Sequence, residues 1–383
     1  IANLYIVYFS YIFNNVIYYI RNYKKGGIEK FMLRKMSSKW LGMFVLALCV
    51  IWSIPAAVYA ESGKDSGGLE KYVTIGGKQV RTILYGDMNA SKETFADDGK
   101  QTLVMLPALA VPSPNIYFKP LAQALQDRFH VIVVEPLGYG LSDQTAKERT
   151  VENINEEIYE VLEQLDVEKC VLLTHSISGI YGLNFVETYP EKVDGFIAID
   201  NTVYDAGLAE ALKMEQQYIL QGAEEFDALR NTFPSLHDFQ NAIASNPDEY
   251  GAALPKIAGY TYTEQDREEY LEAYSRSSNE TVRNEISLME QASNTIIDKK
   301  FPSDLSVLMM ISSDNVDAMP VWETAHYKQL NFEGGNHEIH IVEGGHYIWY
   351  TNLTEIIQKI NSWQESLTQN SENNFVPELA VAA

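Results

Sequence analysis

The chain has 383 residues, of which 46% are hydrophobic and 21% charged, and its formal net charge at pH 7 is −23. So acidic a composition excludes the usual kind of nucleic-acid-binding protein, because phosphate binding needs basic patches. With only two cysteines, Cys49 and Cys170, the chain also cannot be a fold stabilised by several disulfides. The length fits one large domain, or one domain that carries a substantial insertion.

The first 60 residues differ from the rest and fall into two segments. Residues 1–31 begin with Ile and are rich in Ile, Tyr, Asn and Phe. About 20 such apolar residues would span a bilayer, but we interpret 1–31 as a non-native upstream translation of AT-rich DNA. Residues 32–60 have a basic start, an apolar centre and small residues before Glu61, which is the pattern of a signal peptide. We predict a signal peptide or signal anchor there.

Export follows from that prediction. We expect a protein that is secreted, or anchored by its N-terminal apolar segment at the outer face of a bacterial cytoplasmic membrane. Cys170 would then be the one cysteine of the mature chain, and we expect it to be a small buried residue.

Apolar runs bounded by turn residues predict strands, and apolar residues at helical spacing predict helices. The predicted strands are 72–75 and 79–85, joined by a glycine turn, then 102–106, 129–134, 170–173 and 195–200. The predicted helices between them are 118–126, 151–165 and 179–188. Since strands alternate with helices and the strand runs are continuously apolar, we predict an α/β fold. Its mostly parallel, twisted sheet has helices on both faces.

The alternation is interrupted once. Residues 201–303 are polar, rich in Glu and Tyr and mostly helical in pattern, and we interpret them as a helical cap. The core would then comprise 61–200 and 304–367, with strands at 307–311 and 338–342 and helices at 322–330 and 354–367. We expect a disordered tail from 368 to 383.

A serine marks the first candidate site. Ser176 follows the apolar strand 170–173 and precedes the predicted helix 179–188, which is the layout of a nucleophile elbow. The elbow pattern is usually G-x-S-x-G, and here Thr174 and Ser178 replace the two glycines. Other motifs must therefore decide whether Ser176 is a nucleophile.

Three more segments resemble the α/β-hydrolase superfamily in order and spacing. Residues 106–110 (Leu-Pro-Ala-Leu-Ala) stand in place of its His-Gly oxyanion loop. Residues 135–143 (Glu-Pro-Leu-Gly-Tyr-Gly-Leu-Ser-Asp) resemble its "D-x-x-G-x-G-x-S" loop. Residues 342–347 (Val-Glu-Gly-Gly-His-Tyr) resemble its "G-x-G-H" loop. Together they make residues 70–367 similar to capped α/β-hydrolases.

The resemblance implies a catalytic triad in the order Ser, acid, His. Ser176 would be the nucleophile and His346 the general base. Two acids compete for the third place. Asp314 lies at the usual spacing after strand 307–311, whereas Asp200 ends strand 195–200 and takes the role in some relatives. Asp317 is a third, weaker candidate, because it fits a plain turn residue.

The resemblance also implies an oxyanion hole formed by the backbone N–H groups of Leu109 and Ile177. No cofactor is expected. A metal site is not expected either, because His337 and His340 lie on opposite faces of a predicted strand. The expected partner is a small-molecule substrate, and the oligomeric state is not predicted.

We therefore expect a serine hydrolase that cleaves an ester, thioester or amide of a small or acyl-chain substrate. Epoxide hydrolases and haloalkane dehalogenases share the fold but carry aspartate at the elbow, so Ser176 argues against them. Two alternatives stay open: a peptidase similar to proline iminopeptidases, and a catalytically inactive cell-surface binding protein on a hydrolase scaffold.

Overall fold

The computed structural model describes residues 68–89, 94–332 and 337–373. Contacts divide the chain into Ile1–Asp65 and Ser66–Ala383, and the fold below is that of the second unit. The expected upstream translation (1–31) and signal segment (32–60) lie outside the described residues, so export stays a prediction. Among the described residues, no helix has the length and apolar character needed to cross a membrane.

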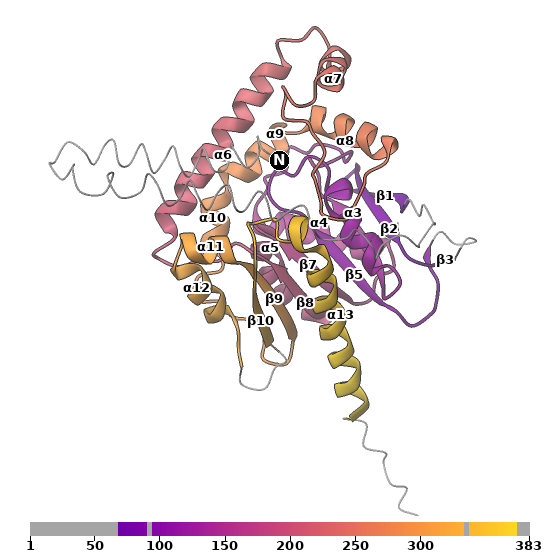
Figure 1. The fold of residues 1–383 in the computed structure, drawn as a ribbon, viewed down its shortest axis with the longest axis vertical. Helices are drawn as coiled ribbons and strands as arrows, with labels where there is room; N and C mark the ends of the chain where they lie inside the picture. Colours follow the sequence, from indigo (N-terminus) through magenta and orange to yellow (C-terminus); the bar gives the residue numbers. More distant parts are fainter. Residues whose placement is uncertain (1–67, 90–93, 333–336, 374–383) are drawn as a thin grey trace, which may run out of the picture. The chain divides into compact units, whose positions relative to one another are not determined.

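One sheet of eight strands forms the centre of this unit (Figure 1). Its strand order is β1-β2-β6-β5-β7-β8-β9-β10. The first two pairings, β1 with β2 and β2 with β6, are antiparallel, and all others are parallel. The strands are β1 (Leu69–Ile75), β2 (Lys78–Tyr85), β5 (Gln101–Leu106), β6 (Phe129–Glu135), β7 (Cys170–His175), β8 (Val193–Ile199), β9 (Ser306–Ser312) and β10 (His337–Val342).

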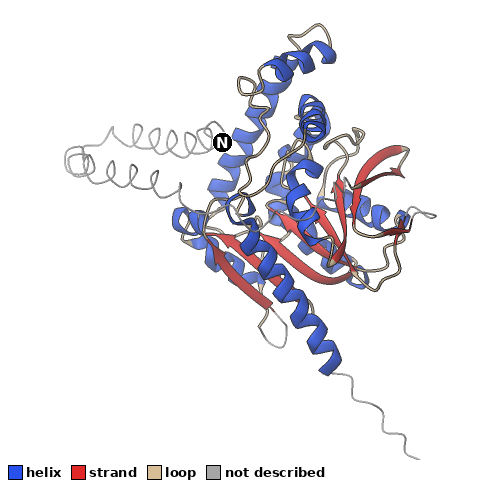
Figure 2. Ribbon diagram, turned by 45° about the vertical axis from the view of Figure 1, so that its right-hand side comes forward, coloured by secondary structure: helices blue, strands red, loops and turns tan. Residues whose placement is uncertain are grey.

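Helices cover both faces of the sheet (Figure 2). One face packs against α4 (Val151–Gln164), α5 (Ser178–Thr188) and α12 (Val321–Gln329), and the other against α3 (Pro114–Leu125) and α13 (Trp349–Asn373). Successive residues of a central strand alternate between the two cores: Val104 belongs to the first and Met105 to the second. The predicted fold class is therefore confirmed.

The interval between β8 and β9 is helical, and Figure 1 shows α6 to α9 grouped beyond one end of the strands. Its helices are α6 (Ala209–Arg230), α7 (Leu236–Ser245), α8 (Glu264–Arg276), α9 (Glu280–Ser287) and α10 (Met289–Asn294). Side-chain caps explain several of their starts. Thr263 and Asp266, for example, form a reciprocal capping box at the start of α8.

Local structure differs from the expectation at three places. The polar segment after residue 89 contains a two-residue strand, β4 (Thr94–Phe95), which pairs with β3 (Met88–Asn89). The loop expected after β9 is a short helix, α11 (Ser313–Ala318), because Ser312 caps it by accepting a hydrogen bond from Asn315 N. Helix α13 continues through 368–373, where we expected a disordered tail, and 374–383 lie outside the described residues.

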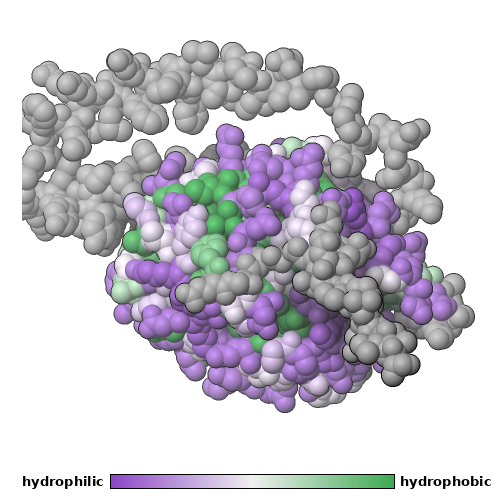
Figure 3. Space-filling model, turned by 90° about the horizontal axis from the view of Figure 1, so that it is seen from below, coloured by the Kyte–Doolittle hydropathy of each residue, from purple (hydrophilic) through white to green (hydrophobic). Residues whose placement is uncertain are grey.

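The described surface is mostly hydrophilic, with scattered hydrophobic patches, on the face seen from below (Figure 3). This agrees with a chain in which about a fifth of the residues are charged. Single exposed apolar residues are normal on such a surface.

Candidate active site

Ser176 lies on the sharp turn between β7 and α5. Its φ angle is 58°, which lies in the left-handed region that residues other than glycine rarely adopt. The turn is fixed by backbone hydrogen bonds, since Thr202 N donates to Ser176 O at 2.8 Å and Ser176 N donates to Ile199 O at 3.4 Å. A strained residue held by its surroundings in this way is typical of a functional site.

The hydroxyl groups of Thr174 and Ser178, which replace the elbow glycines, form hydrogen bonds that stabilise the fold. Thr174 Oγ1 accepts a hydrogen bond from Asn201 Nδ2 at 2.8 Å. Ser178 Oγ accepts from His175 N at 2.9 Å and lies 2.9 Å from Leu106 O, at the end of β5. Gly179 is needed as glycine, because a Cβ there would lie 2.4 Å from Asn201. The departures from G-x-S-x-G thus tie the elbow to the two neighbouring strand ends.

His346 lies in the loop after β10 and is paired with Asp200. Its Nδ1 lies 2.6 Å from Asp200 Oδ2, and its side chain is 16% exposed. A carboxylate can only accept, so His346 donates through Nδ1–H, which leaves Nε2 as the basic nitrogen of the neutral ring. This is the arrangement that a general base requires.

Asp200 is fully buried and follows the end of β8 with a φ of 42°. Three further donors point at its carboxylate: Ser312 N at 2.9 Å, Asn315 Nδ2 at 2.5 Å and Trp322 Nε1 at 2.9 Å. Burial pushes the pKa of Asp200 up, but the hydrogen bond and charge of His346 outweigh it, so the pKa lies below its ordinary value. The group is therefore an ionised carboxylate at neutral pH.

The other two candidate acids, Asp314 and Asp317, differ from Asp200 in their exposure and contacts. Asp314 is exposed, and its carboxylate lies 3.5 Å from Ser313 Oγ rather than against His346. Asp317 is exposed as well. The residues after β9 form α11, whose Asn315 binds the carboxylate of Asp200, so the structure pairs His346 with Asp200 and not with Asp314.

The structure places Ser176 and His346 in the same neighbourhood without a hydrogen bond between them. Ser176 N is bonded to the residue before Asp200, and Asp200 holds the ring of His346. Among the described residues the Ser176 hydroxyl has no hydrogen-bond partner. Catalytic hydrogen bonds are often long without substrate and tighten in the complex.

His175 has a role that the sequence analysis missed. Its Nε2 lies 2.9 Å from His346 O, and its Nδ1 contacts the hydroxyl of Tyr117. Because a carbonyl only accepts, Nε2–H donates to it and Tyr117 donates to Nδ1. Burial and the nearby His346 hold the pKa of His175 well below its usual range, so the ring is neutral. His175 therefore anchors the backbone of the His346 loop.

Two backbone N–H groups are free at the expected oxyanion hole. Within the described part of the chain, neither Leu109 N nor Ile177 N donates a hydrogen bond. The next residue in the first loop, Ala110, has a φ of 59° and donates its N–H to Tyr139 Oη at 3.2 Å. Tyr139 in turn donates to the buried Glu285 of α9 at 2.9 Å. The loop shape is thus held from the cap, a link that no local sequence signal indicated.

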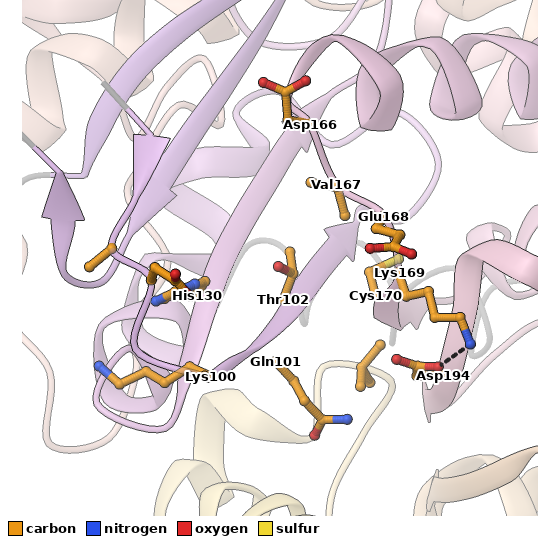
Figure 4. Close-up of a pocket in the computed structure, with 14 residues that line it drawn as sticks. Lys100, Gln101, Thr102, His130, Asp166, Val167, Glu168, Lys169, Cys170 and Asp194 are labelled. Carbon is orange, nitrogen blue, oxygen red and sulfur yellow. Dashed lines mark hydrogen bonds and ion pairs between the residues drawn. The ribbon is translucent and has the colours of Figure 1, made fainter. Parts of the chain in front are cut away.

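A cavity of about 570 Å³ lies elsewhere (Figure 4). Its lining includes Gln101, His130, Cys170 and Asp194, each within the first two residues of a strand. Ser176, Asp200 and His346, in contrast, follow the carboxyl ends of β7, β8 and β10. Ligands of parallel α/β sheets bind at carboxyl ends, so this cavity is not part of the candidate active site.

Among residues 68–89, 94–332 and 337–373, no group of three His, Cys, Asp or Glu side chains could hold a metal ion. His337 accepts a hydrogen bond from Asn331 N at Nδ1 and donates one through Nε2–H to Leu305 O, each at 2.8 Å. His340 lies 3.2 Å from Glu338.

Comparisons with known proteins agree with the observed fold. A family model described as "alpha/beta hydrolase fold" matches residues 101–353, more than half of the chain. The solved structure of Cfl2 from Burkholderia cenocepacia superposes with a TM-score of 0.54, covers 79% of this chain and 98% of its own, and is 16% identical. At this identity, the likeness shows the fold.

Two curated relatives match shorter stretches. The cis-3-alkyl-4-alkyloxetan-2-one decarboxylase of Shewanella oneidensis is 26% identical over 120 residues, 30% of this chain and 37% of the relative. The 2-(acetamidomethylene)succinate hydrolase of Mesorhizobium japonicum is 28% identical over 120 residues, 31% of this chain and 42% of the relative. The chain thus spans less than half the length of these relatives.

Proposed function

The chain belongs to the alpha/beta hydrolase fold family, and from this premise we propose that it is a serine hydrolase. Ser176 attacks the carbonyl carbon of an ester, thioester or amide, and His346 Nε2 takes the hydroxyl proton. Asp200 keeps the other ring nitrogen protonated and stabilises the imidazolium that forms. His346 then protonates the leaving group, and water, deprotonated by the same histidine, releases the acid from Ser176.

Charge that develops on the carbonyl oxygen needs donors already in place. The free N–H groups of Leu109 and Ile177 follow β5 and β7, which are neighbours in the sheet. Removal of one such donor typically costs about 10²–10³ in kcat. The network of Tyr139 and Glu285 that fixes Ala110 therefore supports catalysis indirectly, by holding the oxyanion loop.

One observation carries the proposal: the carboxylate of Asp200, buried and bound by four donors, orients His346 beside the elbow of Ser176. An inactive binding protein was suggested by the missing glycines and the uncertain acid. Thr174 and Ser178, however, form hydrogen bonds that stabilise the elbow, and Asp200 is paired with His346. Both observations support the enzyme instead. A peptidase would use the same groups and differ in its substrate.

Hydrolysis of p-nitrophenyl esters of increasing chain length, with matching p-nitroanilides, tests the proposal. We expect the wild-type protein to cleave at least one ester, and Ser176→Ala to lower kcat/KM by roughly 10³-fold or more. The control Ser287→Ala, an exposed serine of α9, should match the wild type. Anilide cleavage would favour the peptidase. Equal rates for Ser176→Ala and wild type would refute a serine mechanism.

A further inference from the structure

Glu285 of α9 is hydrogen-bonded to both segments that lead to the expected oxyanion donors. The residue is buried, and its Oε1 accepts two hydrogen bonds: one from the hydroxyl of Tyr139 at 2.9 Å and one from the hydroxyl of Tyr181 at 2.8 Å. Tyr139 lies in the loop after β6, whereas Tyr181 lies on α5. A single oxygen atom of the cap thus connects two separate parts of the core.

The Tyr139 hydroxyl leads to the first half of the expected oxyanion hole. It accepts a hydrogen bond from Ala110 N at 3.2 Å, and Ala110, directly after Leu109, has a φ of 59°. Gly140 N donates to Pro112 O at 3.1 Å, so the loop is held at two points. A left-handed residue such as Ala110 persists only where its surroundings fix it. Loss of the Tyr139 hydroxyl would therefore free the backbone next to Leu109 N–H.

The Tyr181 hydroxyl leads to the second half. Tyr181 lies four residues after Ile177, about one helical turn along α5, and Ile177 precedes the first residue of that helix. Because one helical turn is rigid, the hydrogen bond of Tyr181 restrains the start of α5 together with Ile177 N–H. The same carboxylate oxygen of Glu285 therefore acts on both expected donors.

The position of Glu285 is itself restrained. Arg149 Nε forms a buried ion pair with its Oε2 at 3.9 Å. At the start of the same helix, Asn279 Nδ2 donates to Gly138 O at 2.7 Å. Tyr139 also packs in a buried apolar cluster with residues of α6 and α9. Hydrogen bonds enclosed by apolar groups are stronger than the same bonds in water.

We propose that Glu285 is a positioning residue, which sets the two backbone donors of the oxyanion hole through the hydroxyl groups of Tyr139 and Tyr181. The cap thus contributes to transition-state stabilisation without touching the reacting atoms. This inference rests on the proposed function, because it concerns the oxyanion hole of the same site.

Tyrosine-to-phenylalanine variants test the proposal on the p-nitrophenyl ester that the wild type cleaves best. Oxyanion donors act on the transition state, so their displacement should lower kcat and leave KM within about twofold. We expect Tyr139→Phe to lose roughly tenfold or more in kcat, and Tyr181→Phe roughly threefold or more. The control is Tyr85→Phe, which removes a buried hydroxyl that donates to Asn115, and it should match the wild type.

A second pair of variants tests the carboxylate. Glu285→Gln keeps an oxygen that can accept from both hydroxyls, whereas Glu285→Leu has a side chain of similar size without an acceptor. Both remove the charge next to Arg149, so the difference between them reports the acceptor alone. We expect kcat of Glu285→Gln to exceed that of Glu285→Leu by roughly tenfold. Thermal unfolding followed by circular dichroism verifies folding, and the tyrosine variants decide if Glu285→Leu does not fold.

Three results would overturn the proposal while the hydrolase activity stands. The first is equal kcat values for Tyr139→Phe, Tyr181→Phe and the control. The second is a loss in Tyr139→Phe alone, since Glu285 would then not act on the second half of the hole. The third is equal kcat values for folded Glu285→Gln and Glu285→Leu. A wild type that cleaves no ester would contradict the proposed function itself, and the positioning role with it.

Discussion

Asp200 accepts hydrogen bonds from a histidine, a backbone amide, an amide side chain and an indole, all at 2.5–2.9 Å. These donors come from α11, α12 and the loop after β10, as well as from the end of β9. A carboxylate held at so many points cannot rotate away from His346. At the residue scale, this fixed geometry distinguishes the buried Asp200 from the exposed Asp314.

The first prediction compares the two aspartates. Asp200→Asn removes the charge that stabilises the imidazolium and disturbs the tautomer of His346, so ester hydrolysis should fall roughly 10³–10⁴-fold in kcat. Asp314→Asn should change kcat less than about twofold. Steady-state kinetics of both variants checks this, with circular dichroism to verify folding. A larger loss in Asp314→Asn than in Asp200→Asn would contradict the assignment.

At the scale of elements, the junction of β7 with α5 depends on groups that the motif alone does not specify. The strand and the helix could be predicted, because apolar runs and helical spacing are local signals. The partners of Thr174, His175 and Ser178 could not, since Asn201, Tyr117 and Leu106 approach them only in the folded sheet. Which aspartate meets His346 could not be predicted for the same reason.

His175 makes this junction sensitive to acid. Burial lowers its pKa in the folded state below the value of about 6.5 in an unfolded chain. As the pH falls, the unfolded state therefore binds the proton before the folded state does. The free energy of unfolding is unaffected by His175 above about pH 6.5 and decreases below it. The one proton that His175 takes up on unfolding lowers the free energy of unfolding by at most about 1.4 kcal/mol per pH unit.

Urea unfolding at a series of pH values between 7.5 and 5 measures this effect. The wild type should lose more stability over that range than His175→Gln, which cannot take up the proton. The exposed His237→Gln is the matched control, and its pH dependence should parallel that of the wild type. Parallel curves for wild type and His175→Gln would show that His175 does not cause the acid sensitivity.

At the scale of the whole domain, the site is assembled from four separate strand ends. Leu109 follows β5, Ser176 and Ile177 follow β7, Asp200 follows β8 and His346 follows β10. The order of these segments and the helical interval between β8 and β9 could be predicted from the sequence. Apolar strand runs and helical spacing are local patterns that do not depend on the fold. The contact of the cap with the oxyanion loop could not, since Glu285 reaches Tyr139 only through the packing of α9.

Covalent labelling of Ser176 tests this account most directly, because a fluorophosphonate reacts only with a serine that a complete site activates. The probe is applied to the wild type and to Ser176→Ala, and the modified peptide is identified by mass spectrometry. The account predicts one adduct, on Ser176, in the wild type and none in the variant. An unlabelled wild type, or equal labelling of Ser176→Ala, would contradict it.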